Sequence, residues 1–267
     1  MGERVRVRRE RPSALSRALA LMLTMLCVYL ATLGTSAAPP EAVIGTDADA
    51  PRVTEEIVFE PAQAYFVSLG TYASAEEARI EAARYAPRGA GGYVLETDDG
   101  FMLLGAKYTS EADARRVAEN LSETEGLSCT VYAQSAERVR LRVTATEEHI
   151  ALVCEAEAAL RAIAGETADI AAQLDRAEID PEAARTLLNM ASGRLDDLLG
   201  GLRAIPGAME NEVCARLIAL VEQFQASLFV LSGENSKTSL SLSGKIKYNS
   251  IEAALEHMRC LRELNAL

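Results

Sequence analysis

The feature that most constrains the fold is an internal repeat between residues 64 and 135. Its two copies read Tyr65-Phe-Val-Ser-Leu-Gly-Thr-Tyr72-Ala-Ser and Phe101-Met-Leu-Leu-Gly-Ala-Lys-Tyr108-Thr-Ser. Each copy is an apolar run with a Gly, followed by a Ser placed to cap a helix whose first turn is acidic. A further apolar run follows each helix, at 92–96 and 128–132. The order predicts an α+β fold of βαββαβ type, in which two helices cover one face of a four-stranded antiparallel sheet.

Strand alternation assigns the side chains of the two repeated strands to opposite faces of this sheet. One set is expected to face the helices: Val67, Leu69, Met102 and Leu104. The other set is expected to face outward: Phe66, Ser68, Phe101 and Leu103. An outer face this apolar has two interpretations. Its aromatic rings stack on sugars, or another domain or a second copy of the chain covers it.

The repeat resembles the SPOR domain (sporulation-related repeat), and the two copies quoted above carry the resemblance over about 72 of the 267 residues. The resemblance implies a module that binds bacterial peptidoglycan and favours glycan strands stripped of their peptide stems. It also implies a glycan site on the open face, at Phe66, Ser68, Phe101 and Leu103. Two of these depart from the family pattern, which usually has Gln where Ser68 stands and Arg where Leu103 stands.

The N-terminal sequence is typical of a membrane signal. Residues 1–17 contain six Arg and two Glu, and residues 18–38 are 21 uncharged residues in a row. This length suits a transmembrane helix, with a cytoplasmic basic tail and an extracytoplasmic remainder. A cleaved signal peptide is the alternative, because Ser36-Ala37-Ala38 is small enough for a cleavage site. Residues 39–62 mix Pro, Asp, Glu and Ala without a period and predict an exposed linker.

The sequence changes character after the SPOR-like domain, which we place at 63–136. Residues 138–144 alternate charged and apolar side chains and predict a fifth strand at the sheet edge. Four or five amphipathic stripes then predict an all-α antiparallel bundle within a C-terminal domain, 137–267. Gly165 is expected to end or weaken the first of these helices. The polar segment Ser232–Tyr248 reads as a loop, either solvated or a mobile contact surface.

Composition argues against several functional classes. The formal charge is −12, and the basic tail of +4 leaves −16 for the rest of the chain, which disfavours nucleic-acid binding. The chain has two His, and no grouping typical of an enzyme, a metal site or a cofactor site is recognisable. Four cysteines follow the membrane segment and could pair or stay as buried thiols: Cys129, Cys154, Cys214 and Cys260.

Two functions fit these observations. In the first, a single-pass membrane protein binds peptidoglycan glycan strands in cell division or sporulation, and its bundle braces the module or binds a partner protein. Its layout is then similar to that of the stage II sporulation protein B type. In the second, the chain is an extracytoplasmic protein–protein scaffold that keeps the SPOR fold without binding glycan.

Overall fold

The computed structural model describes residues 51–236 and 238–267, so the predicted basic tail and transmembrane helix lie outside the described residues. The described residues belong to one compact unit. Its strands are β1 (Val53–Phe59), β2 (Ala62–Tyr72), β3 (Tyr93–Thr97), β4 (Gly100–Tyr108), β5 (Thr130–Ala136) and β6 (Val139–Ala145). Its helices are α2 (Ala75–Tyr85), the short 3-10 helix η2 (Ala86–Arg88), α3 (Glu111–Glu125), α4 (Glu147–Asp175), α5 (Pro181–Ala204), α6 (Glu212–Ser232) and α7 (Ser239–Asn265).

The repeat folds into a four-stranded sheet in the order β3-β4-β2-β5, with every neighbouring pair antiparallel. Both predicted caps form, because Ser74 Oγ accepts from the Glu77 amide at 3.2 Å and Ser110 Oγ accepts from the Asp113 amide at 3.3 Å. Helix α3 buries Ala114 and Ala118 and helix α2 buries Tyr85 against one face of the sheet, in a core cluster that includes Val67. The predicted βαββαβ order is confirmed.

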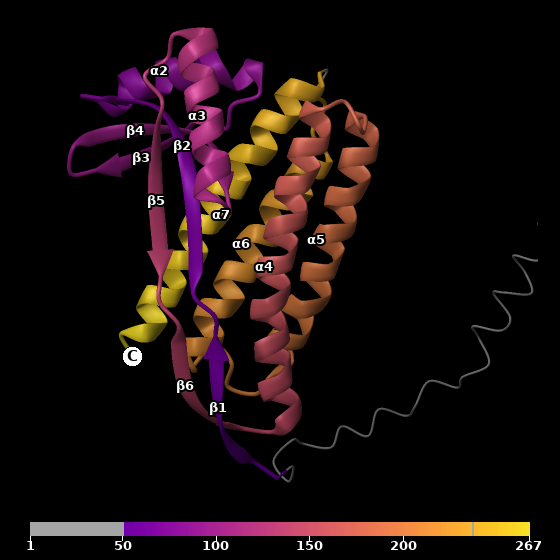
Figure 1. Cartoon of the computed structure of the whole chain (residues 1–267). Coiled ribbons are helices and arrows are strands. Elements are labelled where there is room, and N and C mark those ends of the chain that lie inside the picture. Colours follow the sequence, from indigo (N-terminus) through magenta and orange to yellow (C-terminus); the bar gives the residue numbers. More distant parts are fainter. Residues whose placement is uncertain (1–50, 237) are drawn as a thin grey trace, which may run out of the picture. The chain divides into compact units, whose positions relative to one another are not determined.

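A second, two-stranded sheet pairs β1 with β6 in antiparallel register, from Val53 opposite Ala145 to Phe59 opposite Val139. In the chain β1 leads into β2 and β5 leads into β6, and the small sheet lies beyond the ends of β2 and β5 at these two connections (Figure 1). The predicted strand at 138–144 therefore exists, but it does not extend the edge of the larger sheet. The predicted linker is wrong over 53–59, where Ile57 and Phe59 are buried. Acidic residues next to the buried ones mask the strand pattern in the sequence, and the partner strand β6 is some 80 residues away along the chain.

The C-terminal half forms four helices among the described residues. Helix α4 runs unbroken through Gly165, since that glycine lies on an exposed side of a helix stabilised by its buried stripe. Helix α7 begins inside the predicted loop Ser232–Tyr248. Its polar first turns still fold as a helix because Leu242 and Ile246, four residues apart, are fully buried. Among the described residues, helix α6 is long and apolar enough to cross a membrane, and one of its sides packs into the core of the bundle.

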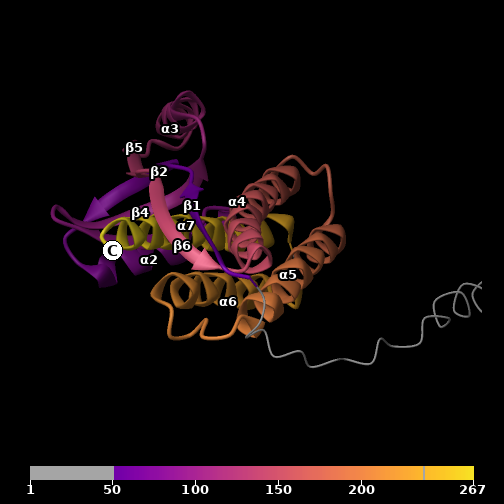
Figure 2. The ribbon, with the colours of Figure 1, turned by 90° about the horizontal axis from the view of Figure 1, so that it is seen from below.

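Helix α7 joins the two halves of the compact unit. It crosses the face of the sheet opposite α2 and α3, and α4, α5 and α6 lie on its far side (Figures 1 and 2). One continuous core therefore includes Phe66 and Leu104 of the sheet together with the inner faces of all four bundle helices. The regions 63–136 and 137–267 share this core, and region 63–136 also has a second core cluster of its own between the sheet and helices α2 and α3.

Candidate functional site

The predicted glycan-binding residues are mostly buried. Phe66 and Leu103 are 0% exposed and Ser68 is 1% exposed, whereas Phe101 lies partly exposed beside the β3–β4 turn. Phe66 packs into the core that contains α7. Ser68 Oγ accepts a hydrogen bond from Gly70 N and donates one to Gly70 O, both at 3.3 Å. Three of the four residues are therefore not available to a sugar in this arrangement.

The expected assignment of faces holds for β2 and fails for β4. Val67 and Leu69 face α2 and α3 as predicted, but Leu103 joins them in that cluster. Leu104 faces the other way and packs into the core with α7. The register between β2 and β4 shifts near Ser68, so the two repeat copies are not equivalent in their pairing. An irregularity of one residue inverts the side-chain alternation, and the sequence alignment of the copies could not show it.

Polar contacts join α7 to the segment after η2 and to helix α4 near one end, and to strand β5 near the other. Near its N-terminus, Lys247 Nζ donates to Gly89 O at 2.7 Å and lies 2.6 Å from Asp175 Oδ2 of α4. Near its C-terminus, Arg262 Nη2 donates to Gln134 Oε1 at 2.6 Å and to Ser135 O at 3.0 Å. Charge-assisted bonds of this kind fix orientation as well as adding stability. The covering of the sheet face is therefore built into the fold.

Glycines allow the backbones to approach closely along the same seam. A Cβ atom on Gly244 of α7 would lie 2.8 Å from both Ala86 O and Ala90 O. A Cβ atom on Gly91 would lie 3.0 Å from the Tyr248 amide nitrogen and from Ile251. All of these separations are shorter than ordinary van der Waals contact, and at Gly244 a side chain would have to displace backbone atoms.

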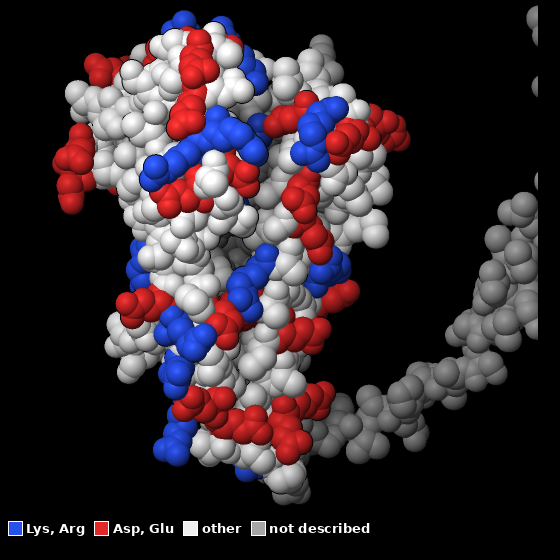
Figure 3. Space-filling model, in the orientation of Figure 1, with Lys and Arg blue, Asp and Glu red and all other residues white. Residues whose placement is uncertain are grey.

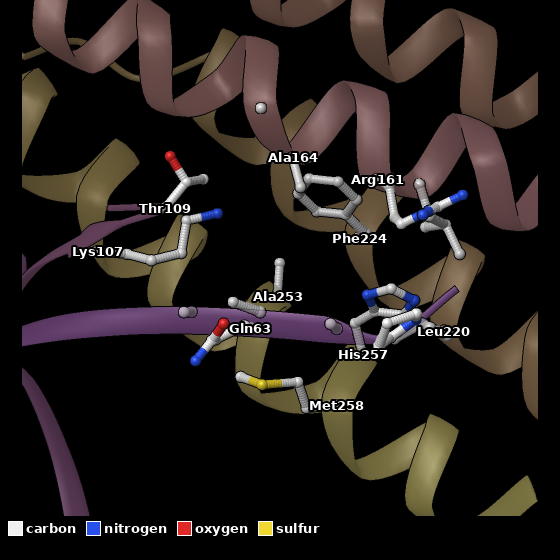
Figure 4. Close-up of a pocket in the computed structure, with 16 residues that line it drawn as sticks. Gln63, Lys107, Thr109, Arg161, Ala164, Leu220, Phe224, Ala253, His257 and Met258 are labelled. Carbon is white, nitrogen blue, oxygen red and sulfur yellow. The ribbon is translucent and has the colours of Figure 1, made fainter. Parts of the chain in front are cut away.

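A cavity of about 240 Å³ remains beside this seam. The surface is hollowed between β2 and α4 in the view of Figure 3, and Figure 4 shows the interior. The cavity is lined by residues from β2 and the segment before it, the end of β4, and helices α4, α6 and α7. Lys107 and Thr109 lie toward one end and Arg161 and His257 toward the other, with Phe224 and Ala253 between them (Figure 4).

Lys107 gives this cavity a cation without a counter-ion. Its ammonium group has no hydrogen bond or ion pair to any residue that the structure describes. Burial lowers the pKa of Lys107 from 10.5 to about 8. At neutral pH the group is still mostly protonated, so a partly exposed positive charge lies beside largely apolar walls.

Glu157 of α4 adds a buried carboxylate near the other end of the cavity. Its Oε1 lies 3.0 Å from Arg161 Nε and 3.4 Å from His257 Nε2, and the Glu157 side chain is 5% exposed. Neither contact has hydrogen-bond alignment, and within the described residues Glu157 Oε1 and His257 Nε2 have no hydrogen-bond partner. The charge of Arg161 is therefore balanced locally, while that of Lys107 is not.

Replacing Glu157 by Gln should lower the free energy of unfolding by about 2 kcal/mol, because Arg161 loses its counter-ion at a partly buried site. Chemical denaturation would measure the change. Glu222→Gln is the matched control, since Glu222 pairs with Arg203 at 2.9 Å and both side chains are about half exposed. We expect the control to change stability by less than about 0.5 kcal/mol. Equal effects of the two substitutions would contradict a structural role for the buried pair.

Replacing Lys107 by Met should raise the free energy of unfolding at pH 7 by roughly 2 kcal/mol. The pKa of Lys107 is lower in the folded chain than in the unfolded chain, so the cost of burying its charge is fully present below pH 8. Between pH 8 and 10.5 the folded chain binds fewer protons than the unfolded chain, and this cost disappears. The advantage of the variant should therefore shrink over that range, as denaturation curves at several pH values would test. A constant difference would contradict a buried ammonium.

The cysteines after residue 38 are free thiols in the structure. Burial raises the pKa of Cys260 to about 11 and raises those of Cys129, Cys154 and Cys214, which disfavours reactive thiolates. Across residues 51–236 and 238–267, no three His, Cys, Asp or Glu side chains are grouped to hold a metal ion.

Two charged residues in the sequence signal the cavity. Glu157 occupies a position on the α4 stripe between Val153 and Leu160 where an apolar residue is expected. Lys107 is the one lysine outside the segment 237–247, and it lies near the end of the apolar strand β4. Charged residues at core positions are the features that point to buried sites. Comparison with protein-family models, with curated proteins and with solved structures found no match to this chain.

Proposed function

We propose that this chain is an extracytoplasmic protein–protein scaffold, anchored in the membrane by residues 18–38, whose SPOR-like module does not bind glycan through its sheet face. The observation that carries the proposal is the position of α7. This helix packs on the face that the family resemblance assigns to glycan. A sugar strand could reach Phe66 or Ser68 only after the helix had left, which would expose the core of the bundle.

Exposed apolar side chains on the bundle support a role in protein contacts. Met190 of α5 is 63% exposed, and so is Phe229 of α6. Helices α5 and α6 are neighbours near these two residues. Ser192 Oγ donates a hydrogen bond to Gln225 O, and Arg185 Nη1 donates one to Glu234 O. Large exposed apolar side chains on adjacent elements are typical of protein-binding surfaces. In this proposal the module and α7 form a rigid support, and the bundle presents the contact surface.

Peptidoglycan binding in cell division or sporulation is the second candidate. It is supported by the two repeat copies and by the strand order of the sheet, which matches the βαββαβ arrangement expected for the SPOR resemblance. Of the four residues assigned to a glycan site, Phe101 alone keeps partial exposure. A glycan-binding function would therefore have to use the β3–β4 edge or another surface.

Co-sedimentation of the full chain with peptidoglycan sacculi, in a non-ionic detergent, distinguishes the two candidates. The scaffold proposal expects the protein to stay in the supernatant, whether or not an amidase has stripped the peptide stems. Pelleting that increases after amidase treatment would overturn it. The Phe101→Ala variant then shows whether the β3–β4 edge carries the binding, because this substitution leaves the shared core intact.

A further inference from the structure

We propose that the cavity between the sheet and helices α4, α6 and α7 binds a small organic carboxylate with an apolar body, and that Lys107 pairs with the carboxylate. The proposal stands apart from the scaffold function, because it depends on the cavity and not on the exposed surface of the bundle. It rests on three features of the cavity: the unbalanced charge, the apolar middle and the size.

The unbalanced charge selects an anion. Three cationic or titratable side chains line the cavity: Lys107, Arg161 and His257. Arg161 and His257 both lie within 3.4 Å of the Glu157 carboxylate, whereas Lys107 has no such partner among the described residues. The Lys107 side chain is partly exposed and lies beside apolar walls, so a negative group that enters the mouth of the cavity would serve as its counter-ion.

Polar neighbours at the same end of the cavity suit a carboxylate. Gln63 and Thr109 line the cavity near Lys107 and are exposed, which places them at its rim (Figure 4). Their amide and hydroxyl groups can donate hydrogen bonds to carboxylate oxygens. The charged head of a ligand would thus lie at the mouth and its remaining atoms would point inward.

The interior of the cavity suits an apolar body. Beyond Lys107 the walls are formed by Leu220 and Phe224 of α6, Ala253 and Met258 of α7, and Leu160 of α4. An apolar cavity of about 150 Å³ holds a benzene molecule, so a cavity of about 240 Å³ has room for roughly eight to ten non-hydrogen atoms. Linear carboxylates of six to eight carbons have this size. Inorganic phosphate would satisfy the charge and leave the apolar walls without contacts.

The test compares hexanoate with the uncharged hexanamide, using the full chain at pH 7 in a non-ionic detergent and isothermal titration calorimetry. We expect the wild type to bind hexanoate at least ten times more tightly than hexanamide. Lys107→Met should remove this preference. Lys245→Met is the matched control, because Lys245 is a partly exposed lysine of α7 that pairs with Glu234, away from this cavity. It should bind hexanoate like the wild type.

A second variant separates the site from the detergent. Ala253→Leu places three more carbon atoms in the middle of the cavity and should abolish binding of both compounds. Both compounds partition into the detergent micelles to the same extent for every variant, so heat that persists in this variant comes from the detergent. The proposal is overturned if the wild type binds hexanoate and hexanamide equally, if it binds neither at millimolar concentration, or if inorganic phosphate competes as well as hexanoate. The denaturation curve of Lys107→Met shows whether this variant is folded, so that loss of its preference for hexanoate can be distinguished from unfolding.

Discussion

Replacing Phe66 by Ala should lower the free energy of unfolding by about 3–5 kcal/mol, whereas replacing Phe101 by Ala should lower it by less than about 1 kcal/mol. Phe66 is fully buried in the core that the sheet shares with α7, and its ring centroid lies 6.4 Å from that of Tyr132. Removing this side chain leaves a cavity that neither a rigid sheet nor a fastened helix can close. Phe101 lies near a turn and belongs to neither core cluster.

Denaturant unfolding of the two variants measures both values under identical conditions. The two side chains are chemically the same and lie in neighbouring strands, so the difference between them reports burial and not residue type. Similar small effects would mean that α7 does not cover the sheet in solution. The open-face interpretation would then return, with Phe66 again available to a glycan. The pair of variants therefore tests the central feature of the fold without any ligand.

The contrast between these residues shows which parts of the fold the sequence could predict. Local patterns were sufficient for the strands and helices of the repeat, because the caps Ser74 and Ser110 and the apolar runs act within a few residues. The same holds for α5, where Asp180 caps the helix and Pro181 follows it. Features that depend on distant partners were predicted incorrectly, including strand β1 and the faces of β4.

The covering of the sheet was one of two interpretations that the sequence left open. The apolar outer face required either a ligand or a covering element, and its own residues could not decide between them. The deciding information lies more than 130 residues away, in Gly244, Lys247 and Arg262 of α7. The sequence signals only two charged residues near the cavity, Glu157 and Lys107, whereas the cavity itself depends on how five elements pack to form its wall.

Replacing Gly244 by Val should lower the free energy of unfolding by about 3 kcal/mol. Even the first added carbon would lie 2.8 Å from the carbonyl oxygens of Ala86 and Ala90, and backbone atoms cannot move aside as flexible side chains do. Helix α7 must therefore shift away from η2 and the sheet. The shift would also strain the bond from Lys247 to Gly89 O, one turn further along the helix. Hydrogen exchange should then increase in α7 and in the strands beneath it.

Gly193→Val is the matched control for this substitution. Gly193 is exposed in helix α5, and a Cβ atom there would meet nothing within 4 Å. Glycine and valine differ little in helix propensity, so the control should change stability by less than about 0.5 kcal/mol. Equal effects at both positions would mean that the seam tolerates a displaced helix. A large loss at Gly244 alone, with faster exchange in β2 and β4, would show that the packing of α7 keeps the sheet face closed. That result would make the closed face a property of the folded state and would leave a glycan only the edges of the module.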